Sequence, residues 1–250
     1  MMDKDMAIEV RHVTKKFKIF YDKGHTMKEL VLFKNRRKYE ERLVLDDISF
    51  SIKKGEGVGL IGRNGCGKST TLKLLTRIIY PNSGEINING RVSSLIELGA
   101  GFHPDMSGRE NIYINAAIFG LTRKEIDAKV DEIIDFSELW DYIDTPVRTY
   151  STGMYMRLAF AVAINVNADI LLIDEILAVG DARFQEKCFN KMREIKARGT
   201  TIVIVSHSLE QIEAICEKSI WIEHGKIKAE GEPKQIHKQY LEFMKNGYIE

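Results

Sequence analysis

The sequence predicts an α/β fold: a mostly parallel sheet with flanking helices, an N-terminal antiparallel β part and an inserted helical subdomain. Short apolar runs of strand length alternate with helical periodicity, which is typical of parallel sheets with helical crossovers. Over residues 99–168 the alternation gives way to helical patterns. We therefore expect one domain, made of a core (1–98 and 169–232), a helical subdomain (99–168) and a terminal helix (233–250).

The individual elements follow from periodicity and from their end signals. Strands are predicted at 8–13, 44–52, 58–61, 84–89, 92–96, 170–173 and 201–205, with a hairpin at 220–229. Helices are predicted at 68–79, 151–166 and 182–198, from Thr122 and from Pro233. Thr122 and Glu125 form a capping box, and Ser151 is a typical N-cap residue.

Composition excludes several classes of protein. The 37 basic and 36 acidic side chains give a net charge of +1, which argues against a basic nucleic-acid-binding protein. No apolar run approaches the roughly 20 residues of a membrane-spanning helix. The three cysteines show no metal-binding or disulfide spacing, which suits a reducing compartment. We expect a chain that is soluble by itself and reaches a membrane only through a partner or a surface contact.

A phosphate-binding loop is predicted between the strand at 58–61 and the following helix. Its sequence, Gly-Arg-Asn-Gly-Cys-Gly-Lys-Ser at 62–69, fits the pattern G-x-x-x-x-G-K-[ST] without a gap. Glycines let backbone N–H groups point inward, and the helix directs its positive end at the same place. Lys68 supplies a charge for the outer phosphates, and the Ser69 hydroxyl is a Mg²⁺ ligand. The predicted nucleotide-binding residues are Gly62, Arg63, Asn64, Gly65, Cys66, Gly67, Lys68, Ser69 and Thr70.

Cys66 has two interpretations. The simpler one is a small side chain at an unconstrained position of the loop. The other is a thiol whose pKa is lowered by the loop amides and Lys68, so that alkylation of the thiol blocks the site.

An acidic pair follows the apolar strand at 170–173. Because ligands of parallel sheets bind beyond the carboxyl ends of the strands, Asp174 is expected beside Ser69 and near Mg²⁺. Glu175 then lies near the γ-phosphate and is a candidate to accept a proton from the attacking water. A small-molecule kinase, whose nucleophile is a substrate hydroxyl, has less need of this glutamate.

Further motifs make the chain resemble the ATP-binding cassette (ABC) ATPases over nearly its whole length. Tyr-Ser-Thr-Gly-Met at 150–154 stands where the family has its signature motif, His207 matches the switch histidine, and 179–181 matches the D-loop. Phe17 stands where an aromatic ring stacks on adenine, with Tyr21 as the alternative. The resemblance implies ATP and Mg²⁺ as cofactors and Glu175, His207 and Lys68 as catalytic residues.

The resemblance also implies a homodimer arranged head to tail. Ser151 and Gly153 open a helix and form a second anion site in the inserted subdomain, which one chain does not easily bring to its own loop. Each ATP is then bound between the loop of one chain and Ser151, Gly153 and Asp181 of the other.

The chain departs from the family pattern at three positions. Thr152 replaces a glycine and Met154 a glutamine of the signature, and the segment 96–104 lacks the usual glutamine. Glu97 stands nearest to that position and remains a candidate Mg²⁺ ligand, although the register is not fixed to one residue.

The chain is similar to a subfamily that exports lipid-linked polysaccharides such as O-antigen, teichoic acid and capsule. The similarity rests on the segments 97–104, 150–160 and 178–181 and on the basic insert before the second strand. That similarity implies peripheral attachment at the cytoplasmic face of the cell membrane through an integral membrane permease, which residues 97–111 would contact. The basic insert at 22–42 contains a possible amphipathic helix at the inner leaflet, or a solvated surface helix. The alternatives are an ABC ATPase for another substrate, a soluble non-transport ABC ATPase, and a nonhydrolytic nucleotide sensor.

Overall fold

The computed structural model describes residues 4–20, 39–96, 98–174, 180–206 and 208–246. Its main sheet has six strands in the order β5-β6-β7-β3-β8-β9. Every neighbouring pair is parallel except β8 and β9, which form the expected antiparallel hairpin. The strands are β3 (Gly57–Ile61), β5 (Val92–Ser94), β6 (Ile170–Asp174), β7 (Thr201–Val205), β8 (Lys218–Glu223) and β9 (Lys226–Gly231). The predicted α/β fold with a mostly parallel sheet is confirmed.

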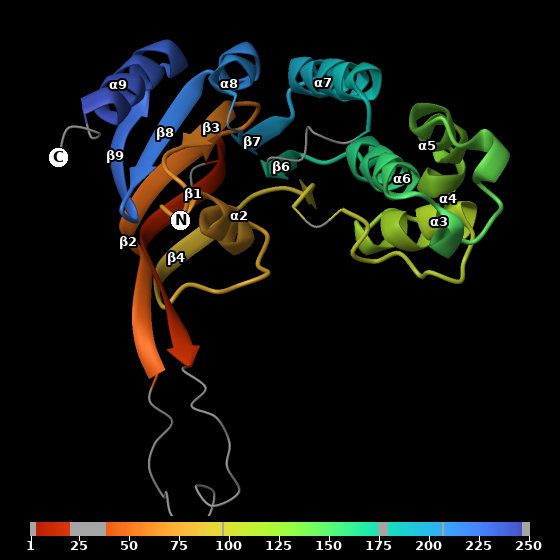
Figure 1. The fold of residues 1–250 in the computed structure, drawn as a ribbon, viewed down its shortest axis with the longest axis horizontal. Helices are drawn as coiled ribbons and strands as arrows, with labels where there is room; N and C mark the ends of the chain where they lie inside the picture. Colours follow the sequence, from red (N-terminus) through yellow and green to blue (C-terminus); the bar gives the residue numbers. More distant parts are fainter. Residues whose placement is uncertain (1–3, 21–38, 97, 175–179, 207, 247–250) are drawn as a thin grey trace, which may run out of the picture.

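A second, antiparallel sheet has the order β2-β1-β4, with β1 (Met6–Phe20), β2 (Tyr39–Lys53) and β4 (Ser83–Ile88). The paired ends of β1 and β2 project from the molecule as a two-stranded ribbon (Figure 1). Both strands are longer than the sequence predicted, and the predicted insert at 22–42 was wrong at its end because 39–42 belong to β2. The rest of that insert, with its predicted helix, lies outside the described residues.

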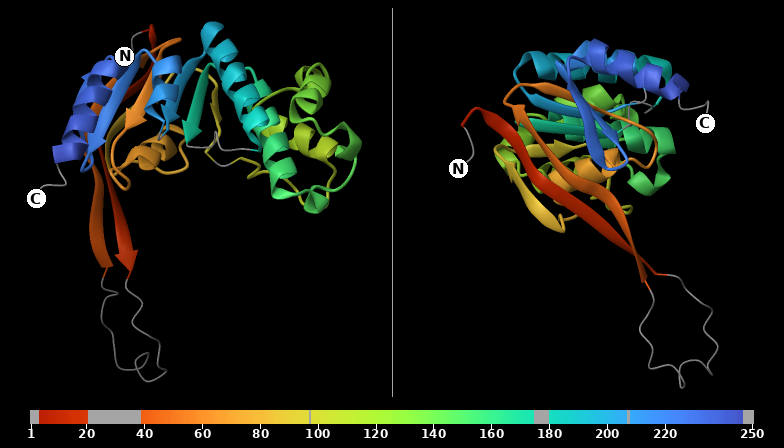
Figure 2. Two further views of the ribbon diagram at one scale, coloured as in Figure 1. Left: turned by 45° about the horizontal axis from the view of Figure 1, so that its top comes forward. Right: turned by 90° about the vertical axis from the view of Figure 1, so that its left-hand side faces the viewer.

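The helices form two groups, one along the main sheet and the other gathered at one end of the molecule (Figures 1 and 2). The group that flanks the main sheet is α2 (Lys68–Leu75), α7 (Ala182–Ala197), α8 (Leu209–Ile215) and α9 (Pro233–Asn246). The second group is α3 (Gly108–Ile118), α4 (Arg123–Asp127), α5 (Val130–Ser137) and α6 (Thr152–Asn165), with short 3-10 turns at Trp140–Tyr142 and Val147–Thr149. Helix α8 was not predicted, and α2 is shorter than predicted.

Two hydrophobic clusters lie on the two faces of the main sheet. Along β6, Leu171 and Ile173 pack into the cluster that includes the second helical group. Ile170 and Leu172 alternate with them and pack into the cluster with β1, β2 and α2. Because each fully buried leucine or isoleucine contributes roughly 1.5–3 kcal/mol, these apolar strands fix the sheet between its two layers.

The predicted capping box at Thr122 is present. The Thr122 hydroxyl accepts a hydrogen bond from the Glu125 amide, and the Glu125 carboxylate accepts one from the Thr122 amide. Ser107 and Glu110 begin α3 in the same way. Among the described residues, no helix combines the length and the apolar character that crossing a membrane requires.

Candidate nucleotide-binding site

The loop at 62–67 joins the carboxyl end of β3 to α2 and turns sharply at three glycines. Gly62, Gly65 and Gly67 have φ values of 146°, 79° and 114°, in the region that favours glycine. A Cβ atom at Gly62 would collide with the carbonyl oxygen of Ile222. The backbone of β8 therefore leaves room only for glycine at the start of the loop.

Helix α2 begins without a side-chain cap. Its N-cap residue is Gly67, which has no side chain, so no N-cap side chain accepts a hydrogen bond from the first turn. The first N–H groups of a helix have no partner within it and carry the positive end of the helix dipole. The start of α2 is therefore suited to bind the oxygens of a phosphate.

The Lys68 side chain is held against the loop. Its ammonium nitrogen lies 2.7 Å from the carbonyl oxygen of Gly62 and 2.9 Å from that of Arg63. Only 7% of the residue is exposed. Because an ammonium group has three N–H donors, these two hydrogen bonds leave one donor for a ligand.

Ser69 and Asp174 lie side by side. The Ser69 hydroxyl donates a hydrogen bond of 3.4 Å to a carboxylate oxygen of Asp174, at the carboxyl end of β6. A hydroxyl and a carboxylate are oxygen ligands of the kind that Mg²⁺ prefers, so this pair fits the ion. Glu175, His207 and Glu97, which the sequence singled out for hydrolysis and Mg²⁺, lie outside the described residues.

A cavity of about 590 Å³ adjoins the loop and extends to the β1–β2 ribbon. Phe17 lines this cavity, as expected of a ring that stacks on a base, whereas Tyr21 lies outside the described residues. Ile19 and Arg42 also line it and were missed by the sequence analysis. Ile19 shares a strand face with Phe17, and Arg42 is the register partner of Phe17. Strand alternation from Phe17 points to Ile19, but only the pairing of β1 with β2 identifies Arg42.

The remaining loop residues in the cavity wall are Asn64, Gly65, Gly67, Lys68, Ser69 and Thr70. Cys66 is buried, with 6% of the residue exposed. Burial raises the pKa of the Cys66 thiol, although the charge of Lys68 opposes the shift. This favours the interpretation of Cys66 as a small packing residue over that of a reactive thiol.

Ser151 and Gly153 lie at the start of α6, in the second helical group. The Ser151 hydroxyl accepts a hydrogen bond of 3.2 Å from the Met154 amide, which leaves its own O–H as a donor. Among the described residues, a Cβ atom at Gly153 would approach the Ser151 hydroxyl oxygen, at 3.8 Å, and no other side chain. The packing of this chain therefore does not require glycine at 153.

Asp181 caps the start of α7. Its carboxylate accepts a hydrogen bond of 2.9 Å from the Phe184 amide and pairs with Arg157 of α6 at 2.8 Å. The amide hydrogen bond, followed by the attraction of Arg157, lowers the pKa of the Asp181 carboxyl. Of the described residues, neither Asp181 nor the pair Ser151 and Gly153 lines the cavity beside the phosphate loop of the same chain.

Comparison with known proteins places this geometry in a family. The family model described as ABC transporter matches residues 45–178. The O-antigen export system ATP-binding protein RfbB of Klebsiella pneumoniae is 46% identical over 245 residues, covering 95% of this chain and 98% of that protein. RfbB of Myxococcus xanthus is 51% identical over 94% of this chain but is longer, with 56% of its length matched. The teichoic acids export ATP-binding protein TagH of Listeria innocua is 43% identical, covering 98% of this chain and 72% of that protein.

Solved structures share the fold. One is described as the ATP binding subunit of an ABC transporter, with a TM-score of 0.75, 24% identity and coverage of 94% of this chain and 93% of that chain. Another is a dimeric post-hydrolysis state of the ATP-binding cassette MJ0796 bound to ADP and Pi, with a TM-score of 0.71, 21% identity and coverage of 90% and 98%. The phosphate loop, the Ser69–Asp174 pair and these matches agree, and the chain belongs to the ABC transporter family.

Proposed function

We propose that the chain is the ATP-hydrolysing subunit of an ABC transporter that exports a lipid-linked polysaccharide across the cytoplasmic membrane. The observation that carries the ATPase assignment is the position of Asp174, 3.4 Å from Ser69 at the entrance of α2. The polysaccharide assignment is supported by relatives that are named for O-antigen and teichoic acid export.

The residues of the nucleotide site have distinct roles in this proposal. The free N–H groups at the start of α2 bind the phosphate chain, and the remaining donor of Lys68 contacts its outer oxygens. Ser69 and Asp174 would hold Mg²⁺, which supplies positive charge for the phosphate oxygens. Phe17 stacks on the base. Glu175 orients the attacking water and accepts its proton, and His207 contacts the γ-phosphate.

A Glu175→Gln variant tests the hydrolytic role. An amide cannot accept the proton, so we expect the ATPase rate to fall about 10²- to 10⁴-fold while ATP still binds. Steady-state phosphate release and equilibrium nucleotide binding measure the two quantities separately. A wild-type rate in this variant would remove Glu175 from the mechanism, and no hydrolysis in the parent protein would favour a nucleotide sensor.

We further propose that two chains associate head to tail. As far as the structure describes the chain, the wall of the cavity beside the loop does not include the Ser151 hydroxyl, the backbone at Gly153 or the Asp181 carboxylate, which α6 and α7 offer. The helical subdomain, which we assign to 99–168, presents Ser151 and Gly153 at its surface. A second chain in the opposite orientation completes each cavity with these groups, so that ATP joins the two protomers.

Mixing two inactive variants tests this arrangement. Lys68→Ala inactivates the loop and Ser151→Ala inactivates the signature. If the parts act in trans, a mixed dimer contains one intact site, because its Ser151→Ala chain keeps the loop and its Lys68→Ala chain keeps the signature. After equal mixing and subunit exchange we expect about a quarter of wild-type ATPase activity, since about half of the dimers are mixed and each has one intact site of two. No recovery despite subunit exchange would contradict the shared site.

A permease partner is supported by an apolar cavity of about 340 Å³ between α3 and the segment that follows β5. Leu98, the small residues 99–101 and Ile118 line it, and Ile118 is 66% exposed. A short helix of the permease, seated here, would cover this surface and hold the chain at the cytoplasmic face of the membrane. Ile118→Glu should abolish co-purification with the permease and leave nucleotide binding by the isolated chain unchanged.

Contact with the inner leaflet is supported by the end of the β1–β2 ribbon. Phe20 and Tyr39 are 58% and 46% exposed, with ring centroids 5.9 Å apart, and the Lys18 ammonium lies 4.4 Å from the Tyr39 ring. Aromatic rings beside basic groups are suited to an anionic membrane surface, to which residues 22–42 would add charge. Sedimentation with anionic and with neutral vesicles tests this, and equal binding to both would contradict the electrostatic contact.

A further inference from the structure

A second cavity with charged walls lies on the opposite edge of the main sheet from the nucleotide site. Its volume is about 240 Å³, and residues 167–168 and Thr200, which precede β6 and β7, form part of its wall. The phosphate loop and Asp174, in contrast, follow the carboxyl ends of β3 and β6. The charged residues that line the second cavity are Lys129, Glu132, Lys191 and Arg198.

These four side chains carry an excess of positive charge. Three are cations and one is a carboxylate, which leaves a net charge of +2. Glu132 pairs with Lys191 at 3.0 Å. Lys129 instead donates to two neutral oxygens, the Asn165 carbonyl at 2.6 Å and the Asn167 side-chain oxygen at 2.8 Å. For the guanidinium of Arg198, the part of the chain that the structure describes offers no hydrogen-bond or ion-pair partner.

The four groups form a single electrostatic cluster. Burial lowers the pKa of Lys129, and repulsion from Lys191 and Arg198 adds to this shift against the attraction of Glu132. The same three cations lower the pKa of Glu132, with the hydrogen bond from Lys191 as the largest cause. A partly buried ammonium that is repelled by two neighbouring cations gains stability when an anion enters the cavity.

We propose that this cavity binds a phosphate dianion, either inorganic phosphate or the phosphate group of a small soluble monoester. A dianion matches the net charge of the walls, whereas a monoanion leaves one cation without compensation. Donors are available: Lys129 keeps one N–H, Lys191 keeps two, and Arg198 presents its guanidinium, whose fork suits phosphate oxygens. Asn167 and Thr200 add polar groups to the wall.

Occupancy of the cavity would connect the two helical groups. Lys129 directly precedes α5 in the second group, whereas Lys191 lies within α7 and Arg198 caps its end. An anion that contacts both sides adds a link between α5 and α7 to those already present, such as the Lys191–Glu132 ion pair and the hydrogen bond from Lys187 to the Phe136 carbonyl. Phosphate should therefore raise the melting temperature of the protein, and this rise should depend on the contact between phosphate and the Arg198 guanidinium.

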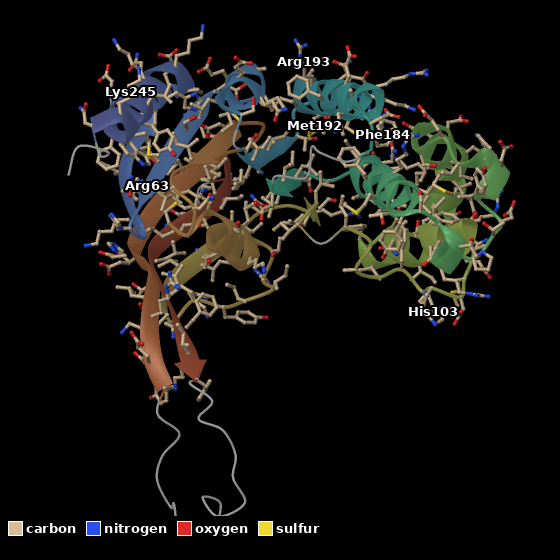
Figure 3. All side chains as sticks on the ribbon, viewed as in Figure 1. Arg63, His103, Phe184, Met192, Arg193 and Lys245 are labelled. Carbon is tan, nitrogen blue, oxygen red and sulfur yellow. The ribbon has the colours of Figure 1, made fainter. Side chains whose placement is uncertain are left out.

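The test measures binding of inorganic phosphate by ³¹P NMR titration in a Lys68→Met background, which weakens competing binding at the nucleotide loop. Arg198→Gln removes one cation, and because its guanidinium has no partner within the described residues, the fold should be unchanged in circular dichroism and melting temperature. The matched control is Arg193→Gln, on the outer surface of the same helix and absent from the cavity wall (Figure 3). We expect saturable binding that weakens about 10-fold in Arg198→Gln and is unchanged in Arg193→Gln.

A second set of ligands tests the charge argument. Glycerol 3-phosphate is a monoester dianion like inorganic phosphate at neutral pH, whereas dimethyl phosphate is a monoanion of similar shape. We expect the dianions to bind at least about 10-fold more tightly than the diester, and the tighter dianion identifies the source. Binding that is independent of Arg198, equal binding of the diester, or no saturable binding of either dianion would overturn the proposal. None of these results depends on ATP hydrolysis.

Discussion

Helices α2 and α6 both begin at a position that we propose to contact the nucleotide, but their first turns are built differently. Helix α2 starts at Gly67, which has a left-handed conformation and offers no side-chain cap. Helix α6 starts at Ser151, whose hydroxyl accepts a hydrogen bond from the Met154 amide. One helix start is therefore incomplete within the chain, and the other is capped by its own sequence.

This difference indicates what each helix start needs from a ligand. At α2 the loop folds back so that its amides and Lys68 converge on a cavity, and a phosphate would supply the missing acceptors. At α6 the first turn is capped by Ser151 without a ligand. The Ser151 O–H remains available as a donor, and the small Gly153 leaves room for a ligand to approach the backbone. In the head-to-tail dimer that we propose, the nucleotide would be bound by α2 of one protomer and contacted by α6 of the other.

The largest expected effect is at α2. Lys68→Met removes a charged donor from the phosphate site, so we expect nucleotide affinity to fall by about 100-fold, at the upper end for a charged hydrogen bond. Titration of a fluorescent ATP analogue measures it. Lys73→Met, on the same helix but absent from the cavity wall, is the matched control. Equal affinity of the Lys68→Met variant would contradict the assignment of the loop.

A smaller effect is expected at α6 from Gly153→Ala. Within the described part of its own chain, the added methyl group has no tertiary neighbour closer than 3.8 Å, and alanine is favoured over glycine within a helix. The melting temperature should therefore stay constant or rise. ATPase activity should nevertheless fall by about 10-fold, because the methyl group separates the backbone from the partner's nucleotide. A fully active and stable variant would show that no ligand approaches Gly153.

The smallest effect is on stability. Ser151→Ala removes the cap of α6, and we expect it to lower the free energy of unfolding by about 1 kcal/mol in urea titration. Thr122→Ala removes the comparable cap of α4 and is the control. Both variants should lose similar stability, but only Ser151→Ala should also lose ATPase activity. Equal activity in the two variants would reduce Ser151 to a structural cap.

Local signals in the sequence were sufficient for the central strands and for the phosphate loop. Strands β3, β6 and β7 are mostly apolar, apart from Asp174 at the end of β6 and Thr201 at the start of β7, because both of their faces are buried. Their limits were predicted to within one residue. Helix α8 was missed because it has only seven residues, although Ser208 caps it. The end of α2 was misplaced: the apolar pattern continues to Ile79, but the helix stops before Arg77, which has a φ of 58°.

The sequence by itself was enough to identify the phosphate loop, its glycines and the carboxylate at the end of β6. The loop depends on residues that are neighbours in the chain, and the carboxylate follows from the rule that ligands bind at the carboxyl ends of parallel strands. Only the tertiary structure decided which distant groups share a space. Lysines at 15, 16 and 18 interrupt the alternation that would have revealed the full length of β1. Pairing with β2 then brings Arg42 into the nucleotide cavity, and packing of α5 beside α7 gathers Lys129, Lys191 and Arg198. Such contacts depend on the register between strands and on the packing between helices, neither of which a local pattern encodes.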